Sequence, residues 1–91
     1  MITIQRYKLE STPHQVLRVP SPAHVVAIDD HSDGACVACF VDPQQPDSVD
    51  LHIYAFAAGD DLCEANNLGP CIGTSIIRET DVVLYYFTGG A

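Results

Sequence analysis

ACVACFVDPQQPDSVDLHIYAF, residues 35–56, is the stretch that decides the fold. Its first seven residues form a short apolar run, and its last eight alternate, with Leu51 and Ile53 on one face and His52 on the other. A period of two is typical of a half-buried strand. The two prolines and two aspartates between the runs favour a turn. The stretch therefore predicts a β-hairpin with a long polar tip at the centre of a sheet protein.

Further short strand patterns lie on both sides of this stretch, at residues 2–9, 15–19, 23–28, 71–77 and 81–87. In the first of them the alternation changes phase near Gln5 and Arg6, which indicates a bulge or an edge position. Residues 58–70 form the longest irregular segment, where residues 61–66 favour one helical turn at most.

About seven short strands without a convincing helix predict an all-β fold, either a small antiparallel sandwich or a partly open barrel. We expect one domain over residues 1–91 with a flexible tail at 88–91. Residues 35–41, 49–57 and 82–87 are expected to be its central strands. A core of this size is modest, and apolar residues on both faces of 23–28 and 36–41 favour a homodimer.

The charge of the chain is strongly negative and unevenly distributed. The net charge is −8, and residues 25–77 hold nine acids but no lysine or arginine. Direct binding to nucleic acid or to an anionic membrane needs clustered cations, so both are disfavoured. A basic partner is favoured, and the alternative is that the charge only maintains solubility. The absence of a signal peptide or long apolar run predicts a cytoplasmic protein with reduced cysteines.

A simple antiparallel meander from residue 25 onward would bring the 29–34 turn and the 58–70 loop to one end. The 42–48 tip and the 78–81 turn would then lie at the opposite end, whereas a Greek-key crossing would change this arrangement. The meander predicts a shared acidic end as the partner-binding site, formed by Asp29, Asp30, Asp33, Asp60, Asp61 and Glu64.

Metal and cofactor motifs are not convincing. Cys36 and Cys39 have the spacing of a zinc pair, but in a strand a separation of three places them on opposite faces. Cys63 and Cys71 do not supply the matching second pair, so we expect all four cysteines to be free thiols that pack as small hydrophobes. Residues 29–34 resemble the start of a calcium loop, but Phe40 stands where the bidentate glutamate belongs. No metal or cofactor is expected.

Catalytic motifs are equally weak, and the sequence predicts a protein that is not an enzyme. It holds neither a P-loop nor a dinucleotide fingerprint, and its histidines are scattered. His52 is expected to be an exposed cross-strand residue. The aromatic residues Tyr54, Phe56 and 85–87 are interpreted as core and sheet-face residues. They would form a stacking platform if their two strands are neighbours.

Several short motifs together resemble an uncharacterised family of small bacteriophage and prophage proteins. They are the opening pattern Ile4-x-x-Tyr7-x-Leu9, the strand Gln15-Val16-Leu17, the tip Val41-Asp42-Pro43 with Pro46, the strand Ile72-Gly73-Thr74 and the closing run 82–87. The tryptophan that the family often places before Val-Asp-Pro is missing here. The resemblance implies a phage origin and an all-β fold, without functional residues to transfer.

By analogy with other small phage proteins, the expected function is that of a non-enzymatic counter-defence inhibitor. Like some anti-CRISPR proteins, it would bind a basic surface of a host protein complex through its acidic end. One alternative is an oligomeric sponge that sequesters a nucleotide immune signal, for which only Arg6, Lys8, Arg18 and Arg78 are available as cations. A minor virion or assembly protein is the other alternative.

Overall fold

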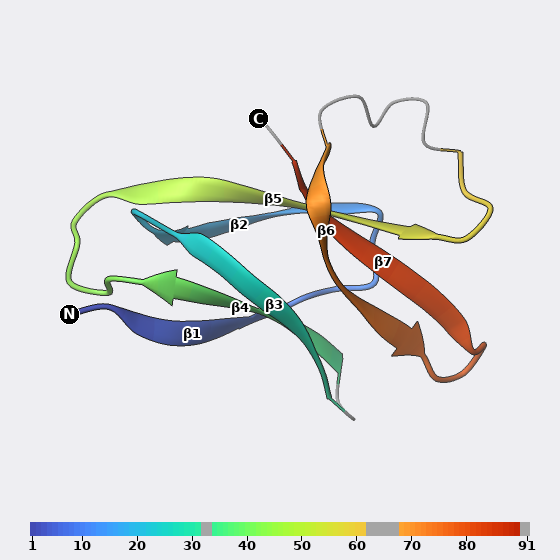
Figure 1. The fold of residues 1–91 in the computed structure, drawn as a ribbon. Coiled ribbons are helices and arrows are strands. Elements are labelled where there is room, and N and C mark those ends of the chain that lie inside the picture. The colour runs from blue at the N-terminus through green and yellow to red at the C-terminus, as the bar shows by residue number, and fades with distance from the viewer. Residues whose placement is uncertain (32–33, 62–67, 90–91) are drawn as a thin grey trace.

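The computed structural model describes residues 1–31, 34–61 and 68–89 of the chain. They form two antiparallel β-sheets that pack face to face (Figure 1), which confirms the predicted all-β fold. Within these ranges there is no helix, and hence none long and apolar enough to cross a membrane. The strands are β1 (Thr3–Lys8), β2 (His14–Pro20), β3 (His24–His31), β4 (Gly34–Val41), β5 (Ser48–Ala57), β6 (Leu68–Ile77) and β7 (Val82–Gly89).

The first sheet has the order β1-β4-β3 and the second the order β2-β5-β7-β6. β4 is therefore the middle strand of the smaller sheet, and β5 and β7 are the two inner strands of the larger one. These are the three runs that the sequence predicts to be central. Their β-branched and aromatic residues fit a position with a neighbouring strand on each side.

The predicted central hairpin is wrong. β4 pairs with β1 and β3, whereas β5 pairs with β2 and β7, so residues 42–47 lead from one sheet to the other. The amide of Gln44 donates to the Asp42 carboxylate and the amide of Gln45 to the Asp42 carbonyl, both at 3.1 Å, which closes a local turn. β7 lies between β5 and β6, so the predicted meander is also wrong.

β1 is an edge strand, as predicted, but it carries no bulge. Its pairing with β4 is continuous from Thr3 to Lys8, and its residues alternate strictly between half-buried and exposed. Ile4 consequently stays on the outer face, 55% exposed, while Tyr7 packs against the core. In the same sheet the register shifts in β3, between Val25 and Ala27, and in the larger sheet it shifts in β6, between Leu68 and Gly73.

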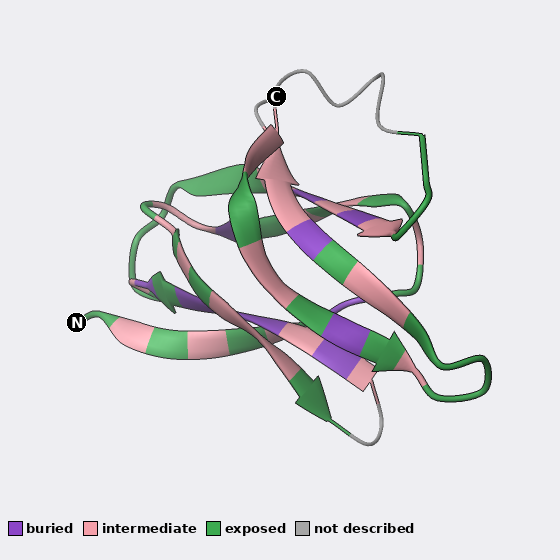
Figure 2. Cartoon of the chain, turned by 45° about the vertical axis from the view of Figure 1, so that its right-hand side comes forward, coloured by how far each residue is buried: buried purple, intermediate pink, exposed green. Residues whose placement is uncertain are grey.

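The core lies between the two sheets, where the inward residues of β4, β5 and β7 meet (Figure 2). Cys39 is fully buried there beside valines, as expected of a cysteine that acts as a small hydrophobe. Cys36 is half-buried, and Cys71 is exposed, so the expectation that the cysteines pack as small hydrophobes is wrong for Cys71. All three are free thiols, and Cys63 lies outside the described residues.

The sandwich is closed along one side, where β3 approaches β6. A Cβ on Gly73 would lie 2.6 Å from the Cβ of Ile28, so only glycine allows this approach. The Ile76 amide donates to the Asp30 carboxylate (3.2 Å) across the same contact. The molecule measures 40 × 31 × 16 Å, and two sheets about 10 Å apart fill the shortest dimension. No third layer covers the outer faces of the described sheets.

Candidate functional site

The predicted acidic end is not assembled as the meander requires. Asp30, at the end of β3, binds the amide of Ile76 and lies 3.9 Å from the Arg78 guanidinium. Residues 29–31 thus belong to strand β3 rather than to the predicted 29–34 turn, and the end of β3 lies beside the 78–81 turn, which was expected at the opposite end. Figures 1 and 2 both show it far from residues 58–61, which follow β5. Asp30 thus has a basic partner that the sequence spacing did not reveal.

The remaining acids of the predicted site are distributed over separate places. Asp29 lies in β3 opposite Cys36, and it is half-buried. The Asp60 carboxylate accepts a hydrogen bond from the Ala57 amide (2.8 Å), so it stabilises the turn after β5. Asp61 follows in the same exposed segment. Asp33 and Glu64 lie outside the described residues, as do most of residues 61–66, where one helical turn is predicted.

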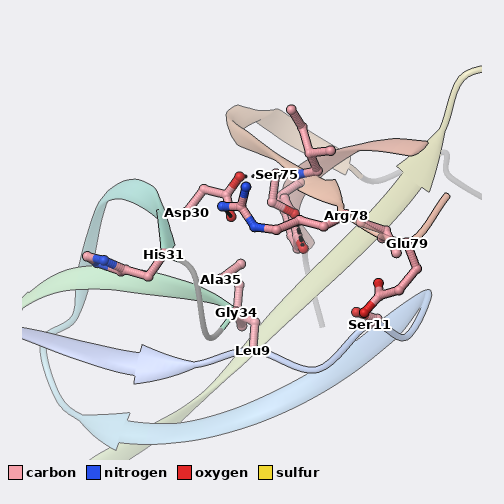
Figure 3. A pocket seen from close by; sticks show the side chains of 12 residues that line it. Leu9, Ser11, Asp30, His31, Gly34, Ala35, Ser75, Arg78 and Glu79 are labelled. Carbon is pink, nitrogen blue, oxygen red and sulfur yellow. Dashed lines mark hydrogen bonds and ion pairs between the residues drawn. The ribbon is translucent and has the colours of Figure 1, made fainter. Parts of the chain in front are cut away.

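A pocket of about 270 Å³ opens at the end of the sandwich where β3 meets β6 (Figure 3). Arg78, Asp30 and Glu79 line it, and Asp30 and Arg78 face each other, which leaves the Glu79 carboxylate as an excess negative charge. Deeper inside, the Ser75 and Tyr86 hydroxyls form a hydrogen bond of 2.8 Å. The His31 ring accepts from Arg6 (2.7 Å) and points away from Arg78. This pocket holds no Ser–His pairing and no surplus of positive charge for an anion.

The outer face of the four-stranded sheet is the more distinctive surface, because it gathers aromatic and imidazole rings from three strands. Pairing of β5 with β7 sets Tyr54 opposite Phe87 and Phe56 opposite Tyr85. Pairing of β2 with β5 sets His14 opposite Tyr54. All of these side chains are exposed or half-buried. We call this surface the aromatic face; it consists of His14, His52, Tyr54, Phe56, Tyr85 and Phe87.

Most of these rings stand side by side in one row. The His14 ring stacks on Tyr54 with centroids 4.4 Å apart, and its Nε2 atom meets the Nδ1 atom of His52 edge to edge in a hydrogen bond of 3.0 Å. The Tyr54 and Phe56 rings are parallel at 6.4 Å, and Phe87 is tilted against Phe56 at 6.1 Å. Gly89 leaves room for the row, because a Cβ at that position would collide with the Tyr54 ring. Rings stacked on one another turn mainly their edges outward, unlike a platform whose ring faces receive bases.

Sequence reasoning recovered part of this face and missed part of it. The two aromatic strands are neighbours, and His52 is on the outer face, as expected. Tyr86 differs from Tyr85 and Phe87, because it points into the core and is 2% exposed. His14 was not identified, since its contact with His52 depends on which strand pairs with β5. Strand alternation separates Tyr86 from its neighbours, but it gives no signal for His14.

The smaller sheet also leaves apolar side chains on its outer face. Ile4 lies opposite Phe40 in the pairing of β1 with β4, and Val26, at the β3 bulge, is exposed as well. Their exposed fractions are 55%, 44% and 45%. Arg6 and Lys8 continue the exposed face of β1 beyond this patch, so it is apolar at one end and basic at the other.

No protein-family model, curated protein or solved structure matches this chain.

Proposed function

We propose that this protein is a non-enzymatic binding protein that holds a basic surface of another protein against its aromatic face. The observation that carries the proposal is the row of rings across β2, β5 and β7, which is half-exposed on a sheet face that no other described element covers. Large apolar rings held in place by their neighbours lose little entropy on binding, and they are enriched at protein interfaces.

The charge around the aromatic face indicates the chemistry of the partner. The four strands of this sheet carry one cation, Arg18, whose guanidinium lies 3.3 Å from the Asp50 carboxylate. The described loops and turns next to these strands carry the cation Arg78, which lies 3.9 Å from the Asp30 carboxylate, and a larger number of acids, among them Glu10, Asp47, Asp60, Asp61, Glu79 and Asp81. An apolar surface with an acidic border complements a partner whose arginines and lysines surround an apolar patch. Long aliphatic stems of these cations add contact with the rings.

The resemblance to phage proteins gives this binding a biological setting. We propose a cytoplasmic counter-defence inhibitor that occupies a basic, nucleic-acid-binding surface of a host complex. A nucleotide sponge is supported less well, because a nucleotide phosphate needs an unpaired cation beside the rings and Arg18 is already paired with Asp50. In this proposal the acids surround the aromatic face and attract the basic partner, whereas the sequence analysis expected them to gather at a single end of the molecule.

The test compares substitutions of two similarly exposed aromatic side chains, one on each sheet. Tyr85→Ser changes the aromatic face, and Phe40→Ser changes the outer face of the smaller sheet; the native side chains are 41% and 44% exposed. Each variant and the wild type are immobilised, challenged with host lysate at low and high salt, and the captured proteins are identified.

We expect basic proteins that bind the wild type and Phe40→Ser but not Tyr85→Ser, and that salt releases. Capture that is equal for all three proteins, or that depends on Phe40 instead, would refute the proposed role of the aromatic face. Melting curves of both variants confirm that each is folded before the comparison is made.

A further inference from the structure

The pocket at the end of the sandwich, where β3 meets β6, has no part in the proposed function, because no residue of the aromatic face lines it (Figure 3). Its volume of about 270 Å³ is just below the about 300–1,000 Å³ of pockets for drug-sized ligands, so it fits a smaller molecule. We propose that this pocket binds a free α-amino acid with an apolar side chain, whose carboxylate contacts Arg78 and whose ammonium group contacts Glu79.

Arg78 supplies the donors for the carboxylate of the ligand. Its guanidinium lies 3.9 Å from the Asp30 carboxylate, which makes an ion pair but is too long for a hydrogen bond. A guanidinium has five N–H groups in a planar fork, so one edge can bind a carboxylate while another stays near Asp30. Asp30 also accepts the Ile76 amide at 3.2 Å, and it therefore keeps the guanidinium at the pocket.

The buried hydroxyls of Ser75 and Tyr86 supply one further donor. Both residues line the pocket, their exposed fractions are 6% and 2%, and their oxygens are 2.8 Å apart. The two hydroxyls have two protons, but the hydrogen bond between them uses only one. Within the described ranges no other group accepts the second proton, so the pair can donate it to an oxygen of the ligand.

Glu79 supplies the negative end of the pocket. Figure 3 shows its side chain beside Ser11, whereas Asp30 and the end of the Arg78 side chain lie toward His31. No cation of the described residues forms an ion pair with the Glu79 carboxylate. An ammonium group of the ligand neutralises this excess charge. A simple anion would be repelled by Glu79 and a simple cation by Arg78, so the pocket complements a zwitterion.

The apolar part of the lining indicates the side chain of the ligand. Leu9 and Ala35 line the pocket and belong to the hydrophobic core between the sheets. An aliphatic side chain in contact with them leaves water, which favours binding. The small volume and the two carboxylates of Asp30 and Glu79 exclude a nucleotide, so this site differs from the sponge considered above.

L-Leucine is the appropriate probe, because its carboxylate, ammonium group and side chain match the parts of the pocket. It is titrated into ¹⁵N-labelled protein, beside isoamylamine, which lacks the carboxylate, and isocaproate, which lacks the ammonium group. We expect leucine to shift the signals of Gly34, Ile77 and Arg78, and each analogue to bind about tenfold more weakly or worse, because a charge-assisted contact is lost. Shifts centred on the aromatic face, equal binding of an analogue, or no shifts at millimolar leucine would overturn the proposal.

Variants identify the groups that hold the ligand. Arg78→Gln and Glu79→Gln should each weaken leucine binding by about tenfold or more. Arg18→Gln is the matched control: it removes another exposed arginine with an acidic partner, and binding should not change. Equal affinity in Arg78→Gln would overturn the proposal, and the titration of the wild type decides the matter if a variant does not fold. Tyr85→Ser should bind leucine like the wild type, so this proposal and the proposed function fail independently.

Discussion

The hydrogen bond between Ser75 and Tyr86 offers a quantitative test of the packing between β6 and β7. The two oxygens are 2.8 Å apart, and the side chains are 6% and 2% exposed. Tyr86→Phe keeps the ring in the core and creates no large cavity, but it leaves the Ser75 hydroxyl without its partner. A buried polar group that loses its partner costs about 1–3 kcal/mol.

The pocket at the end of the sandwich narrows the range expected for this loss of stability. Ser75 and Tyr86 both line the cavity of about 270 Å³ at the end of the sandwich, so water can reach the freed hydroxyl. The cost should therefore lie in the lower half of the range, at about 1–2 kcal/mol. In a domain of this size 1 kcal/mol corresponds to about 4–8 °C, so Tyr86→Phe should lower Tm by roughly 4–16 °C.

A double-mutant cycle separates the hydrogen bond from other effects. Ser75→Ala should also destabilise the protein, because the Tyr86 hydroxyl then lacks its partner. The double variant Ser75→Ala/Tyr86→Phe should lose less than the sum of the single losses, by about 1 kcal/mol. Urea denaturation of the four proteins gives the free energies of unfolding.

Tyr85→Phe is the matched control, because it removes a neighbouring hydroxyl from an exposed ring and should change stability by less than about 0.5 kcal/mol. Strictly additive losses in the cycle, or a loss in Tyr85→Phe equal to that in Tyr86→Phe, would show that the buried hydrogen bond is not what stabilises this contact.

Three further predictions follow from other contacts. Gly73→Ala places a Cβ 2.6 Å from Ile28 at a φ of +154° and should lower the free energy of unfolding by about 2–4 kcal/mol, whereas Gly59→Ala (φ +93°), with nothing within 4 Å, should lower it by about 1–2 kcal/mol. Equal losses of the two variants in urea denaturation would refute the close contact between β3 and β6. Burial raises the pKa of the Cys39 thiol, so this thiol ionises first in the unfolded chain, and stability should fall as the pH rises above the ordinary thiol pKa of 9.0. Cys39→Ala should flatten the decline of Tm between about pH 7 and 10, and an unchanged dependence of Tm on pH would contradict this prediction. The apolar patch around Phe40 should support the expected homodimer, so light scattering should give a dimer for the wild type and a monomer for Phe40→Lys, and a monomeric wild type at high micromolar concentration would exclude it.

Much of the strand pattern was predictable because it depends on local chemistry. Alternation in residues 49–56 and the apolar run at 35–41 specify strands and the faces that they bury. The β-branched and aromatic residues of these strands and of 82–87 indicate inner positions, and they occupy them in β4, β5 and β7. Turn residues between the runs then give seven strands and an all-β fold.

The pairing of the strands was not predictable in the same way. A hairpin and a connection between two sheets bury the same faces of residues 35–41 and 49–57, so the side-chain pattern fits both. The difference lies in the partners of their backbone groups: β4 pairs with β1 and β3, leaving no free edge for β5. Strands that are distant in the sequence compete for these backbone groups, and the alternation of side chains contains no information about which strand pairs with which.

The functional surfaces depend on that pairing. The sequence indicates that Tyr54, Phe56 and His52 share a face, because they are two residues apart in one strand. Only the pairing of β2 with β5 brings His14 within 3.0 Å of His52, and only the approach of β3 to β6 gives Asp30 its contact with Arg78. Residues far apart in the sequence meet where strand register and sheet packing place them, and those are properties of the whole folded chain.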